Sequence, residues 1–248
     1  PVIGGEKLVL RCLQPTHNIT PLQQTGLLEQ QYAWFARCLS QTQGLILVTG
    51  PTGSGKTSTL YSAMSQLDTE RSNVCSVEDP VEVPLPGCSQ VMVNARQGLT
   101  FASILRALLR QDPDVILIGE IRDAETAKIA VQAAQTGHLV LSSLHTNNCL
   151  DTLKRLHSLG VNPLDIRSSL KLIVSQRLLP VADSHSRTEK NRQAVFEVVP
   201  WLDTTEGLIE TLTNSRASIE DLRHYLGHLK LPDFSQALQH YIDSGLIS

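Results

Sequence analysis

"LILVTGPTGSGKTSTLYSAM", residues 45–64, passes from an apolar run through a glycine-rich turn into a helical pattern. Residues 50–57 fill the pattern GxxxxGK(S/T), which marks a phosphate-binding loop when a strand precedes it and a helix follows it. Both neighbours are expected, because Leu45–Thr49 is a β-type run and Lys56–Leu67 gathers its apolar residues on one helical face. The stretch therefore predicts a strand, a phosphate-binding loop and a helix, in that order.

Each residue type in the loop has a physical task. The glycines let the backbone curl so that its N–H groups face phosphate oxygens, and the helix that follows directs its positive dipole end at the same anion. Lys56 is expected to reach the β- and γ-phosphates, and the Thr57 hydroxyl to ligate Mg²⁺. A chance glycine-rich turn is the alternative, and the flanking strand and helix argue against it. The expected binding residues are Gly50, Pro51, Thr52, Gly53, Ser54, Gly55, Lys56, Thr57 and Ser58.

Short apolar runs alternate with helical patterns along the first part of the chain. The expected strands are Leu45–Thr49, Val74–Val77, Val91–Asn94, Val115–Gly119 and Leu139–Leu144, and the expected helices between them are Lys56–Leu67, Phe101–Leu109 and Ala124–Thr136. A strand that is apolar at every position suits the middle of a parallel sheet covered on both faces. The expected fold class is therefore α/β, a P-loop NTPase with a mainly parallel sheet.

After about residue 150 the expected strands nearly stop. Leu150–Gly160 and Pro163–Gln176 are expected to be helices, and Ala182–Arg192 is polar and loop-like. Ala194–Val199 is expected to be a last strand, followed by a helical tail. The α/β core is thus expected to be followed by a smaller, mostly helical subdomain.

Composition argues against several classes of protein. A net charge of −3 and an aromatic content of 4% indicate neither the basic excess nor the stacking platforms of a nucleic-acid binder. The apolar runs are far shorter than the roughly 20 residues of a membrane-spanning helix. Five cysteines without a CxxC pair argue against a disulfide framework and a thiolate zinc site, and they favour a reducing, cytosolic setting. Because the chain starts inside an alternating pattern, "PVIGGEKLVLRCL", we expect it to be a piece of a longer protein.

Hydrolysis of a triphosphate needs a carboxylate that orients the attacking water, and two strand ends offer one. "VCSVEDPVE" ends a strand in Glu78 and Asp79, and "DVILIGEIRD" ends another in Glu120. In a parallel sheet both lie at the carboxyl edge, beside the phosphate loop. Solvated acids that merely end strands are the alternative, but an all-apolar strand that ends in an acid, as before Glu120, is the Walker B arrangement.

Two histidines bracket the next strand. "TGHLVLSSLHTN", residues 136–147, places His138 before the strand and His145 after it. At the carboxyl end, His145 is in a position to sense a γ-phosphate by hydrogen bonding to it or to the water-positioning glutamate. A lone histidine is more often structural, so chemistry alone leaves these roles open.

Four segments, in their order and spacing, resemble the motor ATPases of type II secretion and type IV pilus assembly, the GspE/PilB group, and most closely those of the HofB kind. They are "GPTGSGKT", "VEDPVE" (Asp box), "LRQDPDVILIGEIRDAETA" (Walker B) and "TGHLVLSSLHTN" (His box). The resemblance extends over essentially the whole chain. It implies that residues 1–14 end a preceding domain, that residues 15–177 form a P-loop ATPase core of the RecA/AAA-like kind and that residues 178–248 form a C-terminal subdomain.

The resemblance also implies roles for individual residues. The implied catalytic residues are Glu120, Lys56, Glu78 and His145; Gly50 to Ser58 would bind the nucleotide together with Asp79, His138 and Arg122, and Thr57 would ligate the metal. Basic positions of the family are matched by Arg11, Arg106, Arg110, Arg122 and Arg155. In ring ATPases such arginines reach a neighbour's phosphate or hold the ring together, and ordinary surface ion pairs are the alternative.

One departure from the family concerns zinc. Members commonly carry a four-cysteine zinc module after the segment that matches "SQRLLP", but residues 178–195 contain no cysteine. His185 alone cannot make a tetrahedral site, so no structural zinc is expected.

The implied activity is ATP hydrolysis with Mg²⁺ by a homo-hexamer that is cytoplasmic and peripheral to the inner membrane. Its motion would reach an inner-membrane platform protein and extrude pilin or pseudopilin subunits. A retraction motor of the same superfamily and a nucleotide-binding paralogue without turnover are the alternatives. A nucleic-acid translocase is disfavoured by the acidic balance and the few aromatic residues, and no nucleic-acid partner is expected.

Overall fold

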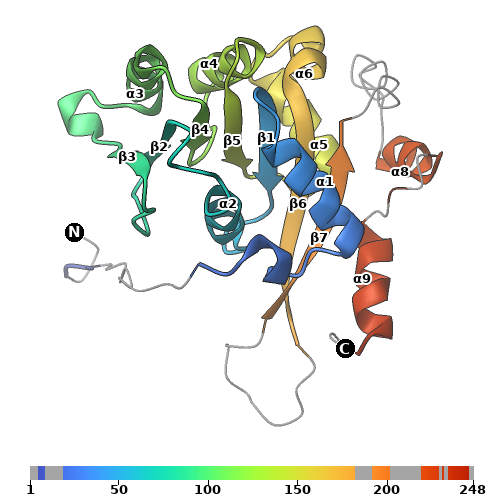
Figure 1. Ribbon diagram of the computed structural model, residues 1–248. Helices are drawn as coiled ribbons and strands as arrows, with labels where there is room; N and C mark the ends of the chain where they lie inside the picture. The colour runs from blue at the N-terminus through green and yellow to red at the C-terminus, as the bar shows by residue number, and fades with distance from the viewer. Residues whose placement is uncertain are drawn as a thin grey trace.

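The computed structural model describes residues 5–8, 19–181, 192–201, 219–228, 231 and 234–245. Its centre is a seven-stranded sheet in the order β3-β2-β4-β5-β1-β6-β7 (Figure 1). The strands are β1 Gly44–Thr49, β2 Val74–Glu78, β3 Cys88–Met92, β4 Val115–Ile118, β5 Leu139–Leu144, β6 Leu170–Pro180 and β7 Arg192–Pro200. The helices are α1 Glu29–Leu39, α2 Lys56–Met64, α3 Phe101–Leu108, α4 Ala124–Gln135, α5 Cys149–Ser158, α6 Pro163–Ser169, α8 Ile219–His228 and α9 Phe234–Asp243, with short 3-10 turns at Leu22–Gln24, Ala95–Gln97 and Leu109–Gln111.

The strands run parallel except for β7, which pairs antiparallel with β6. β1 lies between β5 and β6, and its last residue, Thr49, is level with Leu144 and Ser175. The carboxyl ends of parallel strands share one edge of a sheet, so the residues that follow β1, β2, β4 and β5 meet there. The expected α/β class with a mainly parallel sheet is confirmed.

Side-chain alternation along β1 divides the core into two layers. Leu45 and Leu47 pack into a cluster with buried residues of α3, α4, α5 and α6, whereas Ile46 and Val48 pack into a cluster with α1 and α2. Successive side chains of a strand point to opposite faces, so a strand that is buried at all its positions requires helices on both sides. The apolar run of β1 therefore accounts for its central place in the sheet.

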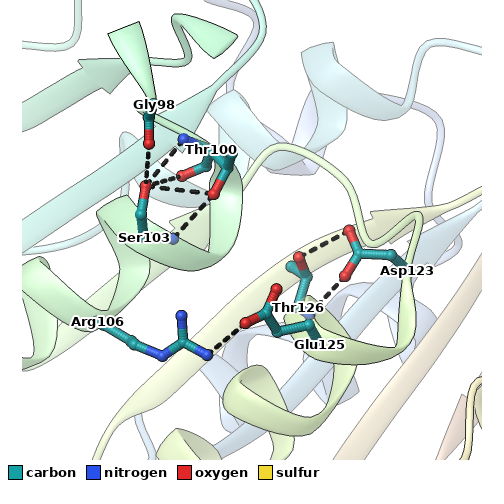
Figure 2. A network of polar contacts seen from close by, with 7 residues as sticks. All are labelled: Gly98, Thr100, Ser103, Arg106, Asp123, Glu125 and Thr126. Atoms are coloured by element: carbon teal, nitrogen blue, oxygen red, sulfur yellow. Dashed lines mark hydrogen bonds and ion pairs between the residues drawn. The ribbon is translucent and has the colours of Figure 1, made fainter.

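Local capping fixes the starts of α3 and α4, which lie side by side (Figure 2). The Thr100 side chain accepts a hydrogen bond from the Ser103 N–H, and the Asp123 side chain accepts one from the Thr126 N–H. Each cap satisfies an N–H group that has no partner within its own helix. Arg106 of α3 and Glu125 of α4 then form an exposed ion pair of 2.5 Å between the two helices, and such a pair contributes about 0–1 kcal/mol.

The second half of the chain differs from expectation. A helix over Pro163–Gln176 is wrong beyond Ser169, because α6 ends there and β6 continues beside β1. Periodicity alone does not distinguish a short apolar run such as Leu170–Val174 in a buried strand from the same run in a helix, and here pairing with β1 selects the strand. The strands therefore do not stop after residue 150. The expected boundary between residues 177 and 178 falls within β6.

Smaller differences concern strand ends and one helix. β3 spans Cys88–Met92 instead of the expected Val91–Asn94. The expected last strand, Ala194–Val199, is confirmed within β7. Helix α1, which packs against β6 and β7, is not among the elements that the sequence predicts. Most of residues 1–14, including Arg11, and most of the expected loop Ala182–Arg192, including His185, lie outside the described residues.

Among the described helices, none has both the length and the apolar character that crossing a bilayer requires.

Candidate functional site

The loop between β1 and α2 has a backbone that glycine makes possible. Gly50, Gly53 and Gly55 have φ values of 149°, 77° and 87°, in the region that other residues rarely adopt. A side chain at Gly50 would also place its Cβ 2.3 Å from the carbonyl oxygen of Gln176. Because Gly55 is the N-cap of α2, the unpaired N–H groups of the first helical turn face the same edge as the loop. The loop has the form that phosphate binding needs.

Lys56 lies within this loop rather than in bulk solvent. Only 8% of the residue is exposed, and Nζ donates hydrogen bonds to the carbonyl oxygens of Gly50, at 2.8 Å, and Pro51, at 3.0 Å. Burial lowers the pKa of Lys56 below its usual value, and the negative charge of Glu120 opposes that shift. The ammonium group is thus held by carbonyl groups at the mouth of the loop.

A pocket of about 640 Å³ opens at the carboxyl edge of the sheet. Three strand ends contribute side chains to it. They are Glu78 at the end of β2 with Asp79 after it, Glu120 and Arg122 after β4, and His145 after β5. The loop residues Thr52, Gly53, Ser54, Gly55, Lys56, Thr57 and Ser58 line the same pocket. Sequence positions that are far apart are therefore brought together as the parallel topology predicts.

Glu120 is held by two cationic or potentially cationic groups. Its carboxylate forms an ion pair with Arg122 and lies 3.3 Å from Nε2 of His145. Burial alone would raise the pKa of Glu120, but the hydrogen bond and charge of Arg122, together with His145, outweigh it and lower the pKa below its usual value. Glu120 is therefore an ionised carboxylate whose position is fixed from both sides.

Glu78 differs from Glu120 because other side chains of the protein occupy its oxygens. It is 3% exposed and accepts hydrogen bonds from the Tyr61 hydroxyl, from Ser76 and from Nε2 of Gln90. Burial, followed by the hydrogen bond to Glu78, raises the pKa of Tyr61. Asp79, in contrast, is exposed, with its carboxylate 3.9 Å from Arg122. The geometry makes Glu78 an anchor between β2, α2 and β3.

The structure does not bring His138 to this pocket, which corrects the expectation that it joins His145 there. His138 precedes β5 and His145 follows it, so about 20 Å of strand separates them. Nδ1 of His138 instead lies 3.1 Å from the carbonyl oxygen of Ala133 at the end of α4. Within this chain His138 is at the opposite edge of the sheet.

The arginines noted in the sequence are dispersed. Arg122 reaches the pocket, whereas Arg106 pairs with Glu125 (Figure 2). Arg155 donates a hydrogen bond of 3.2 Å to the carbonyl oxygen of Arg122, and Arg110 is exposed beyond α3. Within the described residues, no group of three or more histidine, cysteine or acidic side chains is placed to hold a metal ion.

Sequence reasoning missed three residues that shape the site. Tyr61 and Gln90 hold Glu78, and Gln176 contacts the phosphate loop from β6. No motif marks Tyr61 or Gln90. For Gln176 a signal did exist, since "SQR" interrupts an apolar run between residues 170 and 179. Polar residues within a buried strand indicate a contact that the strand must make.

Together the sheet order, the glycine loop between β1 and α2 and the acids at the same edge define the P-loop NTPase class. The family model described as "Type II/IV secretion system protein" matches residues 1–229, and the chain belongs to this family. The family resemblance seen in the four sequence segments is confirmed.

Curated relatives and solved structures agree with this membership. The chain is 56% identical over 190 residues to "Protein transport protein HofB homolog" of Escherichia coli K12, an alignment that covers 77% of the chain and 41% of the relative. It is 52% identical over 178 residues to "Type IV pilus assembly ATPase PilB" of Acinetobacter baylyi, covering 72% and 31%. The crystal structure of "the Pilus Retraction Motor PilT and Bound ADP" superposes with a TM-score of 0.78 at 30% identity, covering 95% of this chain and 66% of that one. The chain spans less than half the length of these two curated relatives.

Proposed function

We propose that this protein is a Mg²⁺-dependent ATPase that powers the extrusion of type IV pilus or type II secretion pseudopilus subunits. The observation that carries the proposal is the pocket that combines the glycine loop around Lys56 with the ionised carboxylate of Glu120. Family membership and the names of the relatives, a protein transport protein and a pilus assembly ATPase, support the biological process.

The residues of the loop fit a triphosphate with Mg²⁺. Ser54 Oγ is buried without a hydrogen-bond partner among the described residues, as a group that awaits a ligand would be. Thr57 lines the pocket and would hold the metal through its hydroxyl. Mg²⁺, when bound, neutralises negative charge on the terminal phosphates.

The other residues would act on the terminal phosphate and the attacking water. Lys56 would exchange its carbonyl acceptors for phosphate oxygens, which bind an ammonium group more strongly. Glu120, kept ionised by Arg122, would accept a hydrogen bond from water and orient it. His145, 3.3 Å from Glu120, would report on the phosphate by hydrogen bonding to Glu120 or to the phosphate itself. Glu78 would support the site by anchoring the end of β2.

The proposal extends to the assembly in which the protein works. It would act as a homo-hexamer on the cytoplasmic side of the inner membrane, and an inner-membrane platform protein would receive its motion, without any nucleic-acid partner. Loss of the terminal phosphate would release closure of the site and so produce a rigid-body movement. A retraction motor is the second candidate, favoured by the likeness to PilT; the higher identity to the HofB homolog and PilB favours assembly.

Glu120→Gln tests the catalytic part of the proposal. Glutamine keeps the size of the side chain but removes its charge, so nucleotide should still bind while ATP turnover falls by about 10²–10⁴-fold. Binding is measured with a fluorescent nucleotide and turnover by phosphate release. Glu70→Gln, an exposed position outside the pocket, is the control and should keep full turnover. Undiminished hydrolysis in Glu120→Gln would remove Glu120 from its role, and an inactive wild type that binds nucleotide would favour the paralogue without turnover.

A further inference from the structure

β6 extends beyond the strand that it pairs with. Its ladder with β1 ends where Thr49 meets Ser175, yet β6 continues to Pro180. Two residues past this point, Gln176 and Leu178, lie close to glycines of the phosphate loop. A Cβ added to Gly50 would lie 2.3 Å from the Gln176 carbonyl oxygen, and one added to Gly55 would lie 2.9 Å from Nε2 of Gln176. One residue therefore touches the loop near its beginning and near its end.

The Gln176 side chain also binds the helix that follows the loop. It is 3% exposed, and its Oε1 accepts a hydrogen bond of 2.7 Å from Oγ1 of Thr59. Thr59 lies in the first turn of α2 and is 1% exposed. A hydrogen bond between two buried side chains fixes geometry strongly, because breaking it leaves polar atoms without water or partner.

The neighbouring residue of β6 supports the other side of the pocket. Ser175 Oγ donates a hydrogen bond of 3.2 Å to the carbonyl oxygen of Asn147, in the loop after β5 that carries His145. Because side chains alternate along a strand, Ser175 and Gln176 point to opposite faces of the sheet. This end of β6 thus contacts both the phosphate loop and the His145 loop.

We propose that Gln176 is a positioning residue for the nucleotide reaction, holding the phosphate loop in the conformation that binds phosphate. The inference rests on the proposed function of the pocket. A loop with several glycines has many accessible conformations, and fixing one of them is entropically unfavourable. The apparent dissociation constant equals the intrinsic constant divided by the fraction of molecules in the competent conformation. Loss of the Gln176 support lowers that fraction and weakens binding.

A double-mutant cycle in the full-length protein that contains this chain tests the inference. Gln176→Leu and Thr59→Val each remove one partner of the hydrogen bond, and each should raise the dissociation constant of a fluorescent ADP analogue about tenfold. The double variant should also show about a tenfold increase rather than a hundredfold one, because both changes break the same contact. KM for ATP should rise in parallel while kcat changes less than about threefold, since ground state and transition state lose the same binding. Thr59→Ser, which keeps the hydroxyl, should retain wild-type affinity.

Gln31→Leu is the matched control for general loss of stability. Gln31 is also a fully buried glutamine, and its side chain donates a hydrogen bond of 2.9 Å to the Phe196 carbonyl oxygen, away from the loop. It should lower the melting temperature and leave ADP affinity unchanged.

Unchanged affinity in folded Gln176→Leu, or effects that multiply in the double variant, would overturn the inference. If Gln176→Leu fails to fold, the ADP affinities of Thr59→Val and Thr59→Ser test the inference instead: it is overturned if Thr59→Val binds ADP as tightly as Thr59→Ser does. A wild type that neither binds nor hydrolyses nucleotide would instead contradict the proposed function.

Discussion

The protonation of Glu120 results from two opposing effects in one pocket. Burial disfavours its charge, and Arg122 with His145 favours it more. The carboxylate therefore stays ionised at a lower pH than an ordinary glutamate, and the stabilisation that it gives the fold is lost only as the pH falls through that lowered pKa. A residue that must accept a hydrogen bond from water needs this ionised form.

Arg122→Gln should move the acid limb of the pH–rate profile. Without the guanidinium, burial is less opposed, the pKa of Glu120 rises, and the acid limb of kcat/KM shifts to higher pH by about one unit. The measurement is ATP turnover between about pH 4 and 9. Arg106→Gln, which removes an arginine paired with Glu125 on the surface, is the control and should leave the limb in place. If the acid limb of kcat/KM does not move in Arg122→Gln, a group other than Glu120 determines the pH at which activity is lost.

At the residue scale, the sequence predicts side chains that belong to a continuous motif. The loop residues, Glu120 and His145 follow apolar strands, and parallel topology then brings them together. The sequence does not predict the hydrogen-bond partners of these side chains. Tyr61, for example, contacts Glu78 only because of the way helix α2 packs in the folded chain. His138 shows the converse error: it shares a motif with His145, yet a strand separates the two.

Among the elements, β6 contributes to the site although its sequence does not identify it as a strand. It pairs with β1, and its Gln176 lies against the phosphate loop. Its apolar run fits either a helix or a buried strand, so only the free edge of β1 decides its conformation. Pairing at long sequence separation is not encoded locally, which is why the strand and its contact with the loop were missed. β1, in contrast, is identified by the glycine motif that follows it.

Gly50→Ala should be more harmful than the same change at another glycine with a positive φ. Alanine at position 50 faces φ of 149° and a contact of 2.3 Å with backbone of β6, which cannot rotate away. Gly98→Ala, at φ of 75° with open space around the added Cβ, is the matched control. We expect about 1–2 kcal/mol loss of unfolding free energy for Gly98→Ala, and a further loss of about 1–3 kcal/mol with loss of nucleotide binding for Gly50→Ala.

Chemical denaturation and fluorescent nucleotide titration measure the two effects. Equal losses of stability in the two glycine variants would mean that β6 adapts to the added methyl group. The rigid support that we ascribe to this end of β6 would then be contradicted.

At the scale of the whole molecule, the pocket is built on the central sheet, which runs through the whole fold. The pocket takes its residues from the ends of four strands that lie side by side, β2, β4, β5 and β1, while β6 and β7 extend the same sheet toward α9. A ligand in this pocket contacts segments that are distant in sequence, and only the folded chain holds these segments together. Nucleotide binding should therefore stabilise the folded chain as a whole rather than one loop.

Thermal unfolding with ADP and Mg²⁺ tests this linkage. At a free ligand concentration 100 times the dissociation constant, mass action adds about 2.7 kcal/mol to the unfolding free energy. For a chain of 248 residues, that corresponds to a rise in melting temperature of about 5–11 °C. Lys56→Ala should lose most of the rise because the ammonium group that meets the phosphates is gone, whereas Lys128→Ala, on the exposed face of α4, should keep it. A rise that survives in Lys56→Ala would place the nucleotide elsewhere on the protein, since only binding at the loop depends on that side chain.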